Sequence, residues 1–176
     1  MEAQEALSDE TAVRAAQDGD ERAFEALYRR YARVVHCILL SRLPASEVED
    51  LVQEVFLTAL KKLKTLREPA AFPGWIATIA RNRATDLLRN RASEEEIDEQ
   101  MADPGADASD RAEARRALAA IQSLPEAYRE TLMLRLVEGL TGPEIAAHTG
   151  LAHGSVRVNL HRGMQMLREA LRREAR

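Results

Sequence analysis

Two stretches of the sequence concentrate side chains that can hydrogen-bond to phosphates and base edges. In the first, residues 75–91 contain four arginines, with only Asp86 to oppose them. Arginine can clamp a phosphate through two N–H groups, and asparagine can pair with the edge of an adenine. Trp75 offers a ring for base stacking, although it also opens an apolar stripe and fits a core position. The candidate nucleic-acid residues here are Trp75, Arg81, Asn82, Arg83, Thr85, Asp86 and Arg89.

The second stretch is the last predicted helix, which begins at Ser155. Its apolar residues recur at helical spacing and must face a core. The opposite side is polar, and residues 157–176 hold six arginines against two glutamates. This distribution is typical of a helix that lies in the DNA major groove. The candidate contact residues are Ser155, Arg157, Val158, Asn159, His161, Arg162 and Gln165.

A third polar group follows one side of the helix expected over residues 47–64. On a helical wheel of about 100° per residue its members fall within about 80° of one another, and Leu57 lies among them. An exposed leucine within a polar stripe is compatible with a protein-binding surface, and a merely solvated face fits the periodicity equally well. The group consists of Asp50, Gln53, Glu54, Leu57 and Lys61.

The elements that position these side chains are all expected to be helices. Ala, Leu, Glu and Arg dominate, β-branched runs are absent, and apolar residues mostly recur every three or four positions. The fold class is therefore all-α. We predict helices over residues 9–17, 20–42, 47–64, 75–91, 108–123, 126–139 and 143–149, and from Ser155 onward, with a capping box from Ser46 to Glu49 on the third.

The C-terminal part has the pattern of a helix-turn-helix. Thr141 and Glu144 form a capping box around a proline in the first turn. The short helix then ends at Gly150, and residues 151–154 form a tight turn before the long helix. Two helices joined in this way, with apolar residues at the packing positions, are typical of DNA-binding proteins.

A strongly acidic segment divides the chain. Residues 92–110 hold eight acidic residues, no basic residue and a Pro104-Gly105 breaker, which is typical of a solvated flexible linker. Residues 1–91 have a net charge of zero and residues 111–176 a net charge of +4, so the overall charge of −4 comes from this linker. We predict two small helical domains with these bounds. We further expect the linker to occupy the place of nucleic acid in a positively charged channel of a partner.

Several classes of protein are excluded by what the sequence lacks. Cys37 is its only cysteine, so neither an internal disulfide nor a cysteine-built zinc site is expected within one chain. No segment has the pattern of a signal peptide or the roughly 18 apolar residues of a membrane span. A cytoplasmic protein without direct membrane insertion follows, and no cofactor is expected, because no glycine-rich phosphate loop occurs.

Three motifs, in this order and spacing, carry a resemblance to a known family: DLVQEVFLTALKKL, FPGWIATIARNRATDLLRNR and LPEAYRETLMLRLVEGLTGPEIAAHTGLAHGSVRVNLHRGMQMLREAL. Over about residues 9–174 the chain resembles bacterial RNA polymerase sigma factors of the extracytoplasmic-function (ECF) group. The resemblance implies that residues 1–91 form sigma domain 2. The polar group on the helix over residues 47–64 would then dock on the β′ coiled coil of core RNA polymerase.

The same resemblance implies the roles of the two nucleic-acid stretches. The helix from Trp75 to Arg91 would capture and melt the −10 promoter element, with the preceding loop accepting a flipped base. Residues 111–176 would form sigma domain 4, whose helix-turn-helix reads the −35 element and whose first helices hold the β flap. An anti-sigma factor is expected as the regulatory partner.

The sequence departs from the family pattern in the last helix. Ala152 stands where Ser or Thr commonly caps it, which costs about 1 kcal/mol of stability. Gly163 costs a further amount on the order of 1 kcal/mol in a helix interior. The outer face, with Val158 between Arg157 and Asn159, is less basic than usual. We therefore expect an unusual −35 preference, with a contact from Val158 to a thymine methyl group.

Other interpretations compete with this one. An enzyme could use His148, His153 and His161 with Glu144 as a metal cluster, but these spacings match no compact metal motif. A DNA-binding regulator could act without polymerase, yet its N-terminal part should then show strands or a ligand pocket. A sigma-like protein could act only by binding an antagonist. Run-off transcription with core polymerase distinguishes that case from a working sigma factor.

Overall fold

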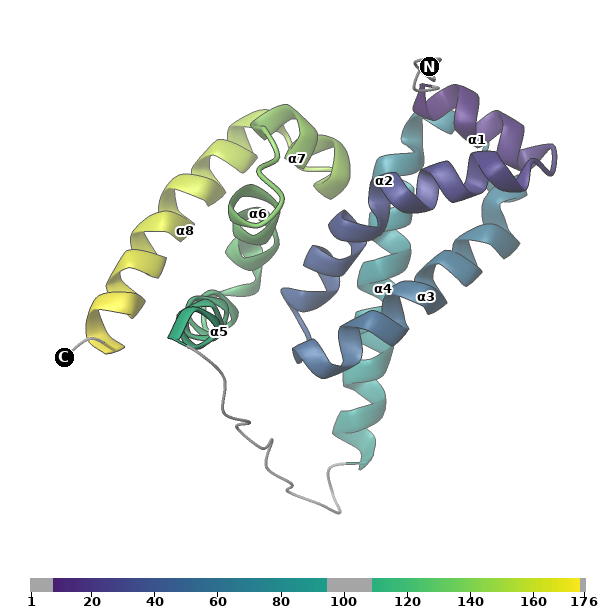
Figure 1. The fold of residues 1–176 in the computed structure, drawn as a ribbon. Coiled ribbons are helices and arrows are strands. Elements are labelled where there is room, and N and C mark those ends of the chain that lie inside the picture. Colours follow the sequence, from purple (N-terminus) through teal and green to yellow (C-terminus); the bar gives the residue numbers. More distant parts are fainter. Residues whose placement is uncertain (1–7, 95–108, 175–176) are drawn as a thin grey trace.

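A computed structural model of the chain describes residues 8–94 and 109–174. These residues form helices and no strand, which confirms the all-α fold class (Figure 1). The first group contains α1 (Asp9–Gln17), α2 (Glu21–Leu40), α3 (Ala45–Lys62), the short 3₁₀ helices η1 (Leu63–Thr65) and η2 (Pro69–Ala71), and α4 (Phe72–Glu94). The second group contains α5 (Ser109–Gln122), α6 (Glu126–Leu136), α7 (Gly142–Thr149) and α8 (His153–Glu174).

In the first group, α2 is the central helix and packs against α1, α3 and α4. Local capping explains where α1 and α2 begin, because Ser8 accepts from the Thr11 amide and Asp20 accepts from two amides at the start of α2. The capping box predicted from Ser46 is wrong. Helix α3 begins at Ala45, directly after Pro44, so Ser46 lies inside its first turn and no side chain caps the helix.

In the second group, the predicted helix-turn-helix is present. The Glu144 carboxylate accepts from the Thr141 amide at 2.7 Å, and Gly150 ends α7 with a φ of 72°, which glycine adopts without strain. Helix α8 begins at His153, two residues before the predicted start. The Val156 amide donates to the Ala152 carbonyl at 3.0 Å, so Ala152 is the residue at the N-cap.

Some large apolar residues of the helices are exposed. Leu136 and Val137 keep 47% and 48% of their surface, because α6 ends at Leu136 and the chain turns away through Gly139. Tyr28 is 38% exposed, and its ring packs edge-on against Phe56 with centroids 4.7 Å apart. Hydrophobic periodicity alone does not reveal where a helix ends, as α6 does at Leu136.

The two groups pack against each other. Helices α6 and α7 lie along α2 and α4, and these contacts join residues far apart in the sequence (Figure 1). The acidic linker, and with it the expected mimicry of nucleic acid, falls largely on residues 95–108, outside the described residues. The limits 1–91, 92–110 and 111–176 remain predictions.

Candidate nucleic-acid and polymerase interfaces

The outer face of α8 presents most of its predicted DNA-contacting residues to solvent. Arg157, Val158, His161 and Arg162 line a surface hollow of about 330 Å³, and Val158 is 43% exposed. Ser155 and Gln165 are exposed as well, whereas the other side of α8 packs into the core through Val156 and Leu167. A helix face with exposed guanidinium groups beside one apolar side chain can clamp phosphates and contact a thymine methyl group.

Asn159 is the exception on this face. It is half-buried, and its amide nitrogen donates to the Ala127 carbonyl of α6 at 3.0 Å. One turn further on, Gly163 faces α6 closely enough that a Cβ built there would lie 3.0 Å from the Leu132 side chain. These two residues fix α8 against α6. Asn159 therefore positions the recognition helix in this structure, and its amide is not held toward a base.

On α4, four predicted residues are exposed: Asn82, Thr85, Asp86 and Arg89. Arg83 lies among them but is bound to the preceding helix, because its Nε donates to Glu54 Oε2 of α3 at 2.6 Å. A hollow of about 400 Å³ lies between α3 and α4. It is lined by members of both predicted sets, with Glu54, Leu57 and Lys61 on one side and Asn82, Arg83 and Asp86 on the other.

The predicted polymerase-binding residues form an open face of α3. Asp50, Gln53 and Lys61 are exposed, and Leu57 keeps 57% of its surface. Leu60, on the same helix, is 49% exposed. Two exposed leucines three residues apart lie on neighbouring parts of a helix face, which strengthens the case for a protein-binding surface.

Trp75 packs partly into the first helix group. Its ring centroid is 5.8 Å from that of Phe72, with the planes tilted by 41°, and Phe72 is wholly buried. Helix α4 begins three residues earlier than predicted, at Phe72, so Trp75 lies in its first turn. The half-buried ring is part of the core and retains an exposed edge.

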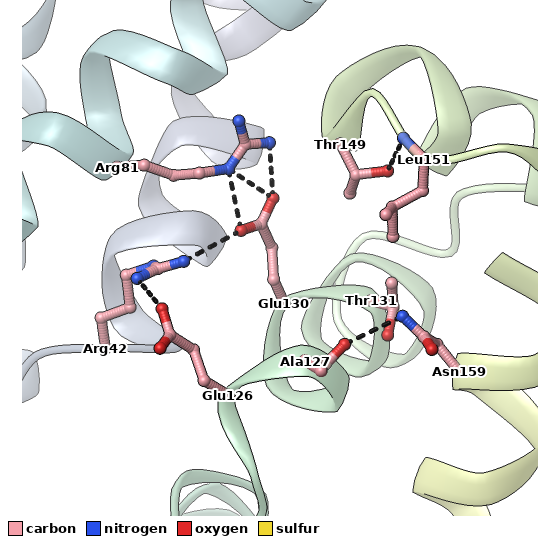
Figure 2. A pocket seen from close by; sticks show the side chains of 9 residues that line it. All are labelled: Arg42, Arg81, Glu126, Ala127, Glu130, Thr131, Thr149, Leu151 and Asn159. Carbon is pink, nitrogen blue, oxygen red and sulfur yellow. Dashed lines mark hydrogen bonds and ion pairs between the residues drawn. The ribbon is translucent and has the colours of Figure 1, made fainter. Parts of the chain in front are cut away.

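Arg81 is the predicted residue whose surroundings differ most from an open DNA surface. Figure 2 shows its guanidinium against the Glu130 carboxylate of α6, with Nη2 2.8 Å from Oε1 and Nε 3.0 Å from Oε2. Its Nη2 also donates to the His148 carbonyl at 2.7 Å. Arg42 approaches the same carboxylate from the end of α2. Glu130 and Arg42 could not be recognised as partners from sequence patterns, because they are 49 and 39 positions from Arg81 in the sequence.

His148 is buried where the two groups meet. Its ring packs edge-on against Tyr31 with centroids 5.7 Å apart, and burial is the main cause that lowers its pKa. Among residues 8–94 and 109–174, no three His, Cys, Asp or Glu side chains lie close enough together to hold a metal ion. Glu144 is engaged at the cap of α7, where hydrogen bonds from Thr141 lower its pKa.

Cys37 also lies between the groups. Its Sγ is 3.8 Å from Glu138 Oε1, and the thiol is buried. Burial, together with the neighbouring carboxylate, raises its pKa to about 12, so the thiol is not reactive while the two groups remain packed.

Comparisons with known proteins agree with this architecture. Family models of sigma-70 region 2 and of sigma-70 region 4 match residues 27–94 and 114–167. The chain is 35% identical to RNA polymerase sigma factor CarQ of Myxococcus xanthus, over 88% of this chain and 92% of that protein. It is 29% identical to the ECF RNA polymerase sigma-E factor of Escherichia coli K12, over 93% and 94%.

Solved structures show the same fold. The structure of CnrH in complex with the cytosolic domain of CnrY matches with a TM-score of 0.69 at 25% identity, over 93% of this chain and 96% of that one. The sigma factor RpoE of Bartonella quintana, crystallised with the anti-sigma factor NepR, matches with a TM-score of 0.64 at 22% identity, over 86% and 98%. Within the described residues, no helix is long and apolar enough to cross a membrane. The chain therefore belongs to the sigma-70 family of RNA polymerase sigma factors, in its extracytoplasmic-function group.

Proposed function

We propose that this sigma factor binds core RNA polymerase through α3 and reads promoters through α4 and α8. The observation that supports the proposal is that α4 and α8, in different helix groups, each expose polar and basic side chains, and that α3 exposes a leucine pair. A regulator that acts without polymerase needs only the helix-turn-helix. It has no use for the Leu57–Leu60 surface beside the hollow between α3 and α4.

In this proposal, α4 contacts the −10 element and α8 the −35 element. Asn82, Thr85 and Arg89 supply exposed donors on α4. On α8, Arg157 and Arg162 contact phosphates or guanine, and Val158 contacts a thymine methyl group. Exposed arginines that neutralise phosphates release counterions, so each such contact adds about one to the slope of binding against salt concentration.

The polymerase contact is proposed to be the β′ coiled coil, held by the face formed by Asp50, Gln53, Leu57 and Lys61. The second helix group is proposed to hold the β flap. The role of the chain is then to give specificity to polymerase, which performs the chemistry, and its place of action is the cytoplasm. An anti-sigma factor is the proposed regulator, because the sigma factor RpoE, which has the same fold, was solved in a complex with the anti-sigma factor NepR.

Promoter protection with reconstituted polymerase tests this function. Core polymerase is incubated with the chain and with a genomic DNA library, and the fragments protected from nuclease are sequenced. We expect protection that requires both proteins and centres on a shared pair of sequence elements. Protection by the chain alone, with no dependence on polymerase, would favour the DNA-binding regulator instead.

A matched pair of arginine variants then tests the face of α8. Arg157→Ala should weaken holoenzyme binding to the protected promoter about tenfold and reduce the salt slope by about one. Arg172→Ala removes the same charge from the exposed last turn of the same helix, about four turns beyond Arg157. Equal losses in both variants would show a general charge effect and contradict the assignment of Arg157.

A further inference from the structure

The two helix groups meet at a boundary that shields a cluster of charged side chains from solvent. At its centre, the Glu130 carboxylate lies between the guanidinium groups of Arg81 and Arg42 (Figure 2). Arg81 faces it with two nitrogens, and Arg42 Nη2 is 3.7 Å from Oε2. We call Arg42, Arg81 and Glu130 the boundary cluster. Its members come from both groups, so the cluster exists only while the groups are packed together.

The cluster is largely screened from water. The side chains of Arg81 and Glu130 keep 22% and 11% of their exposure, and Arg42 keeps 17%. A two-pronged arginine–carboxylate contact is among the stronger hydrogen-bonded pairs, and shielding prevents water and salt from weakening it as they do at an open surface. Arg81 is also anchored by its bond to the His148 carbonyl of α7. The cluster therefore ties α4 to both α6 and α7.

Neutral contacts extend this boundary on either side of the cluster. The Gln122 amide donates to the Leu40 and Leu43 carbonyls at 2.7 and 3.1 Å. Near the start of α4, Gly74 approaches α7 so closely that a Cβ built there would lie 3.1 Å from the Ala147 carbonyl oxygen. The packed arrangement thus depends on specific contacts at several points along the boundary.

A chain closed in this way cannot occupy both promoter elements. Positions −10 and −35 are about 25 base pairs apart, which is on the order of 85 Å at about 3.4 Å per base pair. In the structure α4 and α7 are in direct contact. The two groups must therefore separate before α4 and α8 reach their elements.

We propose that Glu130 is an internal competitor of promoter DNA: its carboxylate occupies, on Arg81, the place of a DNA phosphate and holds the two helix groups closed. Carboxylate and phosphate oxygens accept the same kind of paired N–H groups from arginine, so a phosphate can bind the Nε–Nη2 edge of Arg81 only after Glu130 has left it. The inference rests on the proposed function, since it adds Arg81, one of the residues predicted from the sequence to contact the −10 element, to the proposed contacts of α4. The free chain is then self-restrained, and promoter binding begins with the exchange of Glu130 for phosphate.

Domain opening in the full chain tests the first half of this proposal. Glu130→Gln keeps the shape of the side chain but removes the carboxylate charge that Arg81 binds, while Arg42 keeps its ion pair with Glu126. We expect the radius of gyration from small-angle X-ray scattering to rise. We also expect alkylation of the Cys37 thiol, which lies beside Glu138 at the same boundary, to accelerate about tenfold or more. Glu25→Gln is the matched control, because it breaks an exposed pair with Arg29 within α2. It should leave both quantities at the wild-type value.

DNA binding without polymerase tests the second half. The probe is the non-template-strand oligonucleotide of the −10 element from a promoter that the holoenzyme protects, and its affinity is measured by fluorescence anisotropy at fixed salt. Glu130→Gln should bind about tenfold more tightly than the wild type and Glu25→Gln equally to it. The double variant Glu130→Gln, Arg81→Gln should lose the gain, because the guanidinium that donates to the phosphate is then absent.

Gly74→Ala disturbs the packing at the same boundary without a change of charge. The added methyl group meets a backbone oxygen of α7 at 3.1 Å, so the contact between α4 and α7 must loosen. Faster Cys37 alkylation and tighter oligonucleotide binding are expected here too, by a smaller factor than in Glu130→Gln. This variant keeps the proposal testable if Glu130→Gln fails to fold, which a circular dichroism melt reveals.

The outcomes separate this inference from the proposed function. If the wild type directs polymerase to promoters but both boundary variants keep the wild-type radius, alkylation rate and affinity, the competitor role of Glu130 is wrong and the sigma function stands. If the variants open but the opened chain binds the oligonucleotide no more tightly, Glu130 closes the chain without competing for DNA, and the proposal is again overturned. If no promoter is protected at all, the proposed function fails, while the scattering and alkylation results still decide whether the cluster holds the chain closed.

Discussion

Gly163 offers a test in which two physical effects oppose each other within one helix. Replacing it by alanine in the interior of α8 gains about 1 kcal/mol of helix propensity. The new Cβ would lie 3.0 Å and 3.1 Å from two atoms of the Leu132 side chain and 3.3 Å from the Tyr128 Cβ. Leu132 is completely buried, so it has little room to move. Overpacking of such a site costs about 1–3 kcal/mol.

The clash should therefore exceed the gain in propensity, and Gly163→Ala should lower the free energy of unfolding by about 1 kcal/mol. Gly154→Ala is the matched control. Gly154 lies in the first turn of the same helix, its φ is not positive, and a Cβ built there has no atom within 4 Å. Alanine there should stabilise the protein by about 0.4–1 kcal/mol.

Urea unfolding followed by circular dichroism gives both values. The structure predicts opposite signs for the two variants, with a difference of about 1.5–2 kcal/mol. If Gly163→Ala stabilises the protein as much as Gly154→Ala does, then α8 does not pack on α6 as closely as the structure has it. The position of the recognition face would then have to be reconsidered.

Three further predictions concern the start of α8, the boundary between the helix groups and the polymerase face. Ala152→Ser should stabilise the protein by about 1 kcal/mol in urea unfolding, because it supplies the missing N-cap acceptor; no gain would mean that the cap is already satisfied. Burial lowers the pKa of His148, so the folded state favours its neutral form. The contribution of His148 to the free energy of unfolding is therefore present above the unfolded pKa of about 6.5 and is lost as the pH falls below it. The free energy of unfolding should drop over that range in the wild type and drop less in His148→Gln; identical pH profiles would contradict this. Leu57→Ala should weaken binding to core polymerase about tenfold, or about 1.4 kcal/mol, and leave the urea midpoint unchanged; unaltered affinity would remove Leu57 from the interface.

Local signals in the sequence predicted the helix-turn-helix well. The box formed by Thr141 and Glu144 and the left-handed turn at Gly150 depend on residues within a few positions of each other, so sequence suffices to find them. The same local rule failed at Ser46. Pro44 fixes the backbone one residue before α3 begins, so the helix starts ahead of the serine.

The boundary between the helix groups was beyond the reach of sequence patterns. Arg81 was assigned to DNA because it lies on a basic helix, but its carboxylate partner, Glu130, is 49 positions away on α6. No periodicity relates the two residues, and only the packing of α6 on α2 and of α7 on α4 brings them together. Asn159 was likewise assigned to a base edge, although its amide binds the backbone of α6. Distant pairs of this kind depend on tertiary structure alone.

Gly163 shows how a local cost can have a distant cause. From the sequence it was a helix-weakening residue with no compensating benefit. The structure shows that its missing side chain lets α8 approach Leu132 and Tyr128 of α6. A residue that disfavours its own helix thus favours the packing of two helices.

Mapping the 5′ ends of transcripts tests the central claim most directly. Core RNA polymerase is supplied with genomic DNA, with and without this chain, and the RNA products are sequenced. We predict a set of start sites that appear only when the chain is present and that share two sequence elements, about 10 and 35 base pairs upstream. Transcripts with the same starts in both reactions, or no transcripts at all, would contradict the assignment of this chain as a promoter-specific sigma factor.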